Sequence, residues 1–281
     1  MKNSWIASLA FCLIFLFGFG STVCMADGDV RNPYLYERFT LKGGIMHHSA
    51  TGEFSSKKDG KKKVEVDLDD LGLDEKEYTP FVSARLRLSK RFSLDSGYFG
   101  YHESGKERSQ FDYDFGDITI PVNAITDSEV NLDVYYVNLG LSVYSSENTE
   151  VGIGFGVHAA DFSLQIEAET ESVGQLPPVS IGEETEDILA PLPNLYLFAS
   201  RAIMDNLLLH FNGGWMSLSY DDYDGDLFFV RGLLDYRIKK HFGIGGGYSY
   251  YDFNVDYDPG GKVETYDVKF HGPLVYLILG F

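Results

Sequence analysis

The chain has 281 residues, with 42 acidic and 23 basic side chains and a net charge of −19 at pH 7. This balance argues against a nucleic-acid-binding protein, because phosphate backbones are recognised by clustered cations. Tyrosine, phenylalanine and glycine are abundant, with 19, 21 and 30 residues, and these types favour strands and turns over helices. We therefore expect an all-β protein.

The first 26 residues have the three parts of a secretory signal peptide. Lys2 supplies the positive end, residues 5–20 form the apolar core, and Cys24-Met25-Ala26 is a small-residue cleavage site. The alternative is a transmembrane anchor, but the apolar core is short for a helical span of about 20 residues. Cys12 lies in the same segment, so the exported chain would contain no cysteine. It needs another source of stability, such as a large sheet or a membrane.

Alternation of apolar and polar residues, the pattern of a half-buried strand, recurs about ten times after this segment. The expected strands are residues 38–50, 78–89, 92–104, 130–144, 150–168, 190–202, 206–220, 226–238, 241–257 and 266–281. The connections between them are alternately long and short, and the longest are the acidic segments 51–77, 105–129 and 169–189. This alternation is typical of an up-and-down antiparallel transmembrane β-barrel. We expect ten strands, with eight as the alternative, in one domain of residues 27–281.

Basic residues within the strands test the membrane interpretation. An Arg or Lys that faces lipid at mid-membrane costs about 2–4 kcal/mol, so these residues should oppose the apolar face of their strand. Arg85 and Arg87 do oppose Val82, Ala84 and Leu86. We therefore expect a network of charged side chains inside the barrel: Arg38, Lys42, Arg85, Arg87, Asp95, Asp133, Arg231, Asp235, Arg237, Asp252 and Lys269.

Two glycine stripes, in residues 152–156 and 243–247, share this inward face and would leave room for long side chains that cross the lumen. The alternation changes phase at four places, which predicts either β-bulges or the transition from membrane to water. These places are residues 135–136, 160–161, 250–252 and 272–273. Pro273 would fit a bulge, because its missing N–H would leave no bond unmade there.

The chain ends in the apolar strand PLVYLILGF. Val275, Leu277, Leu279 and Phe281 share one face, which we expect to contact lipid, while pairing of the last strand with the first would close the sheet. A last strand that ends in Phe also resembles the signal read by the outer-membrane barrel-assembly machinery. We therefore expect an outer-membrane protein with both termini in the periplasm.

Five segments together resemble a group of uncharacterised outer-membrane β-barrel proteins of Gram-negative bacteria. They are VDLDDLGLD, LAPLPNL, SYDDYDGDLF, GIGGGYSYYDFNVD and YDVKFHGPLVYLILGF. The resemblance extends over nearly the whole chain after the signal peptide. It implies the same fold and location, but it does not indicate any particular activity.

Catalytic patterns are weak. His47 with Ser49, and His102 with Ser104, have the spacing that places a base and a nucleophile on one face of a strand. Both pairs share the parity of the outward stripes, so we interpret them as polar residues of the rim. We expect no enzyme, and a lipid-modifying enzyme is a distant alternative.

Ligand patterns are also weak. His158, His210 and His271 are expected to face inward as part of the polar packing, and no cysteine and histidine spacing indicates zinc. Residues 221–226 lack the order of oxygen ligands that a calcium loop requires. We therefore expect no metal site and no cofactor.

Ten strands lie between eight-stranded barrels, which side chains fill, and sixteen-stranded barrels, which leave a channel. The first expectation is therefore a porin-like narrow channel for small solutes or ions, which the glycine stripes favour. The alternative is a closed barrel with a structural or surface-interaction role through its acidic loops, which paired lumen charges favour. Expected partners are outer-membrane lipid, lipopolysaccharide and the assembly machinery, without nucleic acid.

Overall fold

The computed structural model describes residues 32–58, 64–67, 76–109, 112–115, 118–170, 179–220, 223–258, 260 and 262–281. The signal peptide predicted for residues 1–26 lies outside these residues. Among the residues described, no helix is long and apolar enough to cross a membrane. The main elements are strands, preceded by one short 3-10 turn, η1 (Pro33–Leu35).

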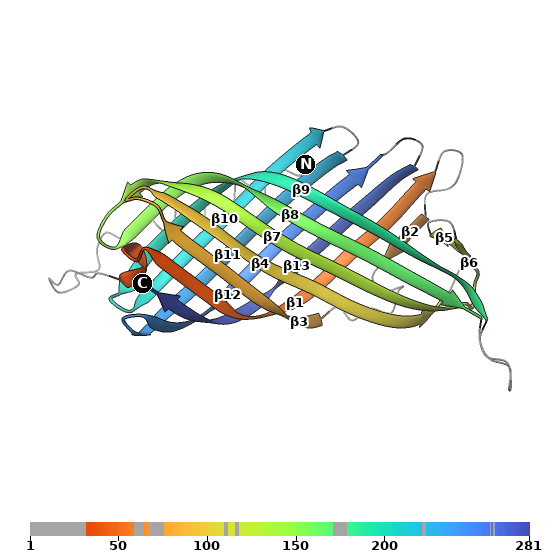
Figure 1. The fold of residues 1–281 in the computed structure, drawn as a ribbon, viewed down its shortest axis with the longest axis horizontal. Coiled ribbons are helices and arrows are strands. Elements are labelled where there is room, and N and C mark those ends of the chain that lie inside the picture. Colours follow the sequence, from red (N-terminus) through yellow and green to blue (C-terminus); the bar gives the residue numbers. More distant parts are fainter. Residues whose placement is uncertain are drawn as a thin grey trace. The chain divides into compact units, whose positions relative to one another are not determined.

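Ten strands form a closed antiparallel ring in chain order (Figure 1). They are β1 (Phe39–Lys58), β3 (Lys76–Arg87), β4 (Phe92–Arg108), β7 (Ile125–Ser145), β8 (Thr149–Glu169), β9 (Ser180–Met204), β10 (Leu207–Tyr220), β11 (Tyr223–Lys239), β12 (Phe242–Tyr257) and β13 (Lys262–Gly280). The last strand, β13, pairs with β1 and closes the ring. The predicted up-and-down barrel of ten strands is confirmed, and the alternative of eight strands is wrong.

Several strands run beyond their predicted ends. β1 continues to Lys58, β7 begins at Ile125 and β9 begins at Ser180. Parts of three segments predicted as loops therefore belong to the barrel wall: residues 51–77, 105–129 and 169–189. β7, β8 and β9 have 21, 21 and 25 residues, whereas a strand crosses a membrane with about 9–11. These strands are therefore longer than a membrane crossing requires. The end of the barrel away from the described termini is here called the loop end, and the opposite end is the terminal end.

The faces of the wall alternate along β13 without a break. Near the terminal end, Val275 and Leu277 are exposed on the outside, whereas near the loop end Val268 and Phe270 are buried inside. Along the strand, the kind of residue on each face changes, but the alternation of inward and outward side chains continues unbroken. The bulges predicted at residues 135–136, 160–161, 250–252 and 272–273 are therefore wrong, and the register shifts lie near strand ends. The predicted transition from membrane to water accounts for the pattern, because an outer face must be apolar in lipid and polar in water.

Pro273 lies at a gap in the seam between β1 and β13. Met46 pairs with Leu274 and Ser49 with His271, in the same register, while the residues between them are unpaired. Because proline has no N–H, it leaves a ladder hydrogen bond unmade. An interruption of the ladder, and not a bulge, accommodates it.

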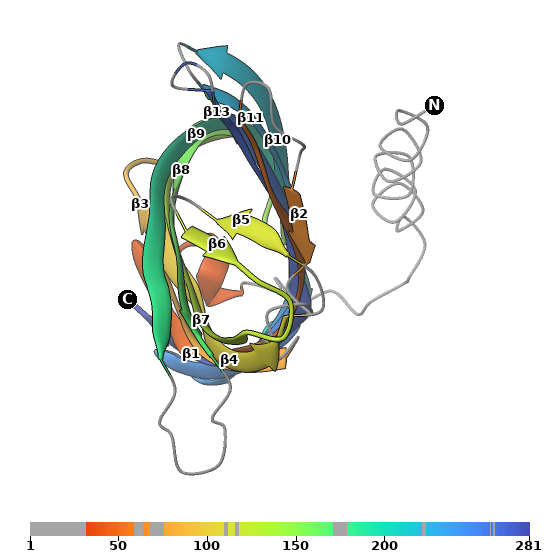
Figure 2. The same cartoon turned by 90° about the vertical axis from the view of Figure 1, so that its right-hand side faces the viewer.

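The interior differs between the two halves. Toward the loop end an apolar core fills the barrel, with Phe99, Tyr101 and Phe270 at most 2% exposed. The hairpin of β5 (Tyr113–Phe115) and β6 (Ile118–Ile120) lies across the opening of the barrel at the loop end, and its Ile120 is fully buried in the core (Figure 2). The short β2 (Val64–Asp67) pairs with the far part of β1. The half toward the terminal end contains polar and charged side chains.

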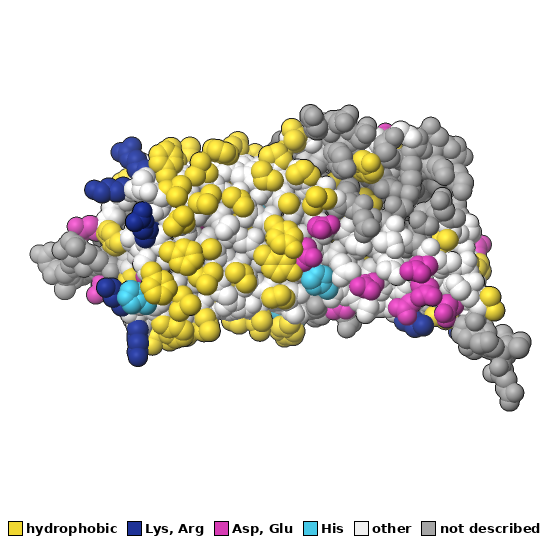
Figure 3. Space-filling view, in the orientation of Figure 1, with side chains coloured by type: hydrophobic (Ala, Val, Ile, Leu, Met, Phe, Trp, Pro, Cys, Tyr) yellow, Lys and Arg dark blue, Asp and Glu magenta, His cyan; other side chains and the backbone are white. Residues whose placement is uncertain are grey.

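The outside of the barrel has three zones (Figure 3). An apolar band surrounds the terminal half, where Phe155, Leu195 and Leu277 are more than half exposed. On the face shown in Figure 3, Lys and Arg gather at the terminal edge and acidic side chains on the loop half. The exposed basic residues of that edge include Arg38, Lys90, Arg91, Lys239 and Lys240.

Candidate functional site

A buried ion pair joins β1 and β11 in the polar half of the lumen. Lys42 Nζ lies 2.7 Å from Asp235 Oδ2, and the Tyr276 hydroxyl donates to Asp235 Oδ1 at 2.6 Å. All three side chains are buried. A buried carboxylate is tolerated when a cation and further hydrogen-bond donors satisfy its oxygens, as they do here.

Glu150, at the start of β8, is the centre of a second charged group. Arg87 Nη1 and Nη2 each donate to one of its carboxylate oxygens at 2.9 Å. Arg85 Nη2 donates at 3.4 Å, and Ser142 donates its hydroxyl as well. Arg85 Nε also lies 3.8 Å from Asp95 Oδ1. Two guanidinium groups therefore share two carboxylates, of which Glu150 is buried and Asp95 is partly exposed.

The segment before β1 closes the terminal end of the lumen. It inserts Tyr34, which is 4% exposed, between Lys42 and Arg85, and both cations lie 5.2 Å from the ring centroid. Arg85 Nη1 also donates to the Tyr34 hydroxyl at 2.8 Å. Glu37 pairs with Arg237, and both side chains are buried. The chain's own residues thus occupy this mouth of the barrel.

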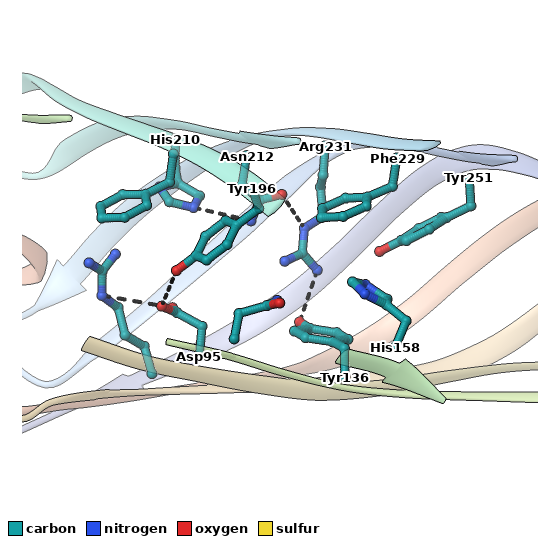
Figure 4. A pocket seen from close by; sticks show the side chains of 12 residues that line it. Asp95, Tyr136, His158, Tyr196, His210, Asn212, Phe229, Arg231 and Tyr251 are labelled. Carbon is teal, nitrogen blue, oxygen red and sulfur yellow. Dashed lines mark hydrogen bonds and ion pairs between the residues drawn. The ribbon is translucent and has the colours of Figure 1, made fainter. Parts of the chain in front are cut away.

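Figure 4 shows side chains from several strands that surround one of the small cavities of the lumen. Two cavities near the middle of the lumen offer about 10 Å³ and about 30 Å³ to the centres of water molecules. One water needs about 10–15 Å³ on this measure. Arg85, Asp95, Tyr136, Asn212 and Arg231 line both cavities. These two cavities therefore have room for a few waters and not for an organic solute.

The glycine stripes face the lumen as predicted, but they do not widen it. A Cβ atom at Gly154 would overlap the Tyr196 ring, and one at Gly245 would overlap the Tyr276 ring. Side chains of the neighbouring strands, among them these two tyrosines, occupy the space that the missing side chains leave. The stripes thus help to fill the barrel, which removes the argument that favoured a pore.

Comparison with known proteins supports the architecture. No family model and no curated protein sequence matches the chain. Among solved structures, the outer membrane protease OmpT from Escherichia coli is similar, with 10% sequence identity, a TM-score of 0.56, and coverage of 86% of this chain and 97% of that chain. The fold is that of an outer-membrane β-barrel. At this identity the likeness concerns the fold alone.

Two further solved structures cover nearly the whole chain with lower scores. The outer membrane protein OprG from Pseudomonas aeruginosa has 10% identity and a TM-score of 0.40, covering 91% of this chain and 99% of that chain. The translocator domain of autotransporter NalP from Neisseria meningitidis has 12% identity and a TM-score of 0.44, covering 99% of this chain and 96% of that chain. All three are outer-membrane proteins of Gram-negative bacteria.

Most of the charged residues predicted for the lumen of this outer-membrane barrel lie inside it. They are Lys42, Arg85, Arg87, Asp95, Arg231, Asp235 and Arg237. The lumen prediction is wrong for Arg38, which is exposed at the terminal edge, and for Asp133, Asp252 and Lys269, which lie on the outer face of the loop half. The error arose because the apolar residues beside Lys269, Val268 and Phe270, face an apolar core and not lipid.

The misplaced residues form exposed polar clusters. Asp133 accepts from the Tyr98 hydroxyl at 2.6 Å and lies 3.1 Å from His102 Nε2. Lys269 Nζ lies 2.6 Å from Asp267 Oδ1 and 3.9 Å from Asp252 Oδ1. Partial burial alone would lower the pKa of Lys269, but its hydrogen bond to Asp267 and the charge of Asp252 raise it. These are charge pairs of a water-exposed surface, each of small energetic weight.

The histidines divide in the same way. His158 and His210 are buried inside and contact Asn194 at 2.8 Å and Ser200 at 2.7 Å, in keeping with the predicted polar packing. His271 lies on the outer face, 2.8 Å from the Tyr248 hydroxyl, so its predicted inward position is wrong. In the part of the chain that the structure describes, no cluster of three His, Cys, Asp or Glu side chains could hold a metal ion.

Sequence reasoning missed Glu150, Glu37 and Tyr34. Glu150 lies on the same strand face as Gly152 and Gly154, which were predicted to face inward. The alternation could therefore have predicted that Glu150 faces the lumen. Tyr34 and Glu37 precede the first strand, so the alternation of a strand does not indicate which way their side chains point. They could not be found without the fold.

Proposed function

We propose that this protein is a closed barrel of the outer membrane with a structural or surface-interaction role. The observation that carries the proposal is the filled lumen. Tyr34 closes the terminal end, ion pairs and tyrosines fill the middle, and an apolar core with Ile120 fills the loop end. This filling favours the closed barrel over the channel that the sequence suggested first. We propose no enzymatic activity.

The proposed orientation places both termini in the periplasm and the loop half outside the cell. The apolar band of the terminal half would lie in the membrane, and export would use the signal peptide predicted at residues 1–26. Val275, Leu277, Leu279 and Phe281 are all exposed on the outer face of the barrel end. Their exposure supports a role as the signal for the barrel-assembly machinery, because a partner can reach them only on that face.

Conductance tests the closed lumen. The refolded protein in a planar lipid bilayer is expected to give no discrete current steps, because the cavities admit only a few waters. Tyr34→Ala is also expected to be silent, because the apolar core still blocks the loop half. Heat-modifiable migration on a gel verifies that each sample is folded, and an open porin serves as the positive control. Discrete steps from the folded wild type would contradict the proposal.

We propose lipopolysaccharide as the partner of the acidic outer surface, through divalent cations. Among the residues whose exposure the structure describes, exposed or half-exposed acids outnumber basic residues on the outer face of the loop half, and they include Asp127, Glu129, Asp133, Asp161, Asp252 and Asp267. Carboxylates repel phosphate groups directly, but Ca²⁺ and Mg²⁺ take oxygen ligands from both. Asp133 and Asp161 lie directly opposite each other on β7 and β8.

Association with lipopolysaccharide vesicles should therefore need divalent cations. We expect a chelator to reduce co-sedimentation several-fold, and Asp133→Asn with Asp161→Asn to reduce the effect of added Mg²⁺. Asp205→Asn changes an exposed acid at the terminal end and is the matched control, expected to behave as wild type. Equal association with and without chelator would count against this partner.

A further inference from the structure

The polar lumen contains more basic than acidic side chains. Its ion pairs are Lys42 with Asp235, Arg237 with Glu37, and Arg85 and Arg87 with Glu150 and Asp95. These pairs balance four cations with four carboxylates. Arg231, which is 8% exposed, is a further cation. Among the described residues, no carboxylate lies within ion-pair distance of it.

The contacts of Arg231 are neutral groups. Nε donates to Asn212 Oδ1 at 3.3 Å and Nη1 donates to the Tyr136 hydroxyl at 3.2 Å (Figure 4). The guanidinium also lies 5.6 Å from the Phe81 ring centroid and 5.5 Å from that of Tyr136. Cation–π contacts stabilise a buried cation in part, but a full charge away from water still requires a counter-charge.

The larger cavity lies beside this excess charge. Its wall contains Arg231, Lys42 and Arg85, together with the polar groups of Asn212 and His210. The acidic residue on the wall is Asp95, whose Oδ1 faces Arg85 and whose Oδ2 accepts from Ser93 and Tyr196. Lys42 is already paired with Asp235, and Arg85 with Asp95 and Glu150, so the excess beside the cavity is the single positive charge of Arg231. Its potential favours an anion.

The size of the cavity limits which anion fits. About 30 Å³ is open to the centres of water molecules, which suits a monoatomic ion or a few waters. Inorganic phosphate or an organic acid would require the surrounding side chains to move. Tyr34 and the ion pairs of the terminal end separate the cavity from bulk solvent on that side.

We propose that the cavity between Lys42, Arg85 and Arg231 binds one halide ion, which in a cell would be chloride. The ion supplies the missing counter-charge of Arg231 and completes the polar packing of the lumen. It binds the folded barrel and not the unfolded chain, because the three cations meet only in the fold. Halide therefore stabilises the barrel in proportion to the logarithm of its concentration.

The test compares halides with gluconate, an anion too large for the cavity, at equal ionic strength. The midpoint temperature of the heat-modifiable gel shift is expected to rise by about 3–6 °C for each tenfold increase in chloride or bromide above the dissociation constant. Gluconate is expected to produce no rise. Arg231→Gln should abolish the halide dependence, whereas Arg91→Gln, at the exposed terminal edge, should retain it.

Crystals of the wild-type protein grown in bromide provide a measurement that does not depend on the folding of a variant. An anomalous bromine peak among Lys42, Arg85 and Arg231 would support the site. A cavity without such a peak, or a midpoint equally high in gluconate, would overturn the proposal and leave a water-filled cavity. Halide dependence that persists in Arg231→Gln would also overturn it.

Discussion

Asp235→Ala is expected to lower the free energy of unfolding by about 3–5 kcal/mol. The substitution leaves the Lys42 ammonium buried without its counter-charge and removes the acceptor of the Tyr276 hydroxyl. Urea unfolding in lipid vesicles measures the change. Trp215 is the sole tryptophan after residue 26 and lies on the outer face, so its fluorescence reports when the barrel leaves the lipid.

An exposed pair provides the matched control. Asp267→Ala breaks the contact of Asp267 with Lys269, where both side chains are more than a third exposed, and is expected to cost at most about 1 kcal/mol. Lys42→Met combined with Asp235→Leu is expected to recover most of the loss, because it removes both buried charges. Equal costs for Asp235→Ala and Asp267→Ala would mean that water reaches the lumen pair, which a filled barrel does not allow.

The contrast between these two pairs shows what the sequence could and could not predict. Alternation along a strand assigns residues to two faces, and Lys42, Arg85 and Arg231 were placed inside because their apolar neighbours needed lipid. The same rule failed for Lys269. Phe270 beside it is equally apolar, but it packs in the apolar core inside the loop half and not against lipid. The period is identical in both halves of β13, and only the surroundings of the two faces change.

The alternation of residues along the strands could not predict the closed lumen, for a different reason. Tyr34 and Glu37 lie before β1, and their positions depend on Arg85 and Arg237, which are distant in sequence. The glycine stripes were placed on the correct face, but whether a glycine widens a lumen or admits a tyrosine depends on the residue paired with it on the neighbouring strand, as Tyr196 is with Gly154 and Tyr276 with Gly245. Such packing depends on the register between strands and not on the sequence of one strand alone.

The boundary between the two halves can be located by substitutions on one face of one strand. Phe155 of β8 is 61% exposed within the apolar band, and Ser163 lies on the same outward face toward the loop end. Phe155→Arg is expected to lower the free energy of unfolding by about 2–4 kcal/mol, because it places a cation in hydrocarbon. Ser163→Arg is expected to change it by less than about 0.5 kcal/mol, because that residue meets water.

The two substitutions add the same side chain to the same strand, so their difference isolates the surroundings of the outer face. Urea unfolding in lipid vesicles with Trp215 fluorescence measures both. If Ser163→Arg were as costly as Phe155→Arg, the loop half would also lie in lipid, and its outward acids would need a different explanation. If neither substitution had an effect, the apolar band would not lie in a membrane, and the chain would be a water-soluble barrel with an exposed apolar surface.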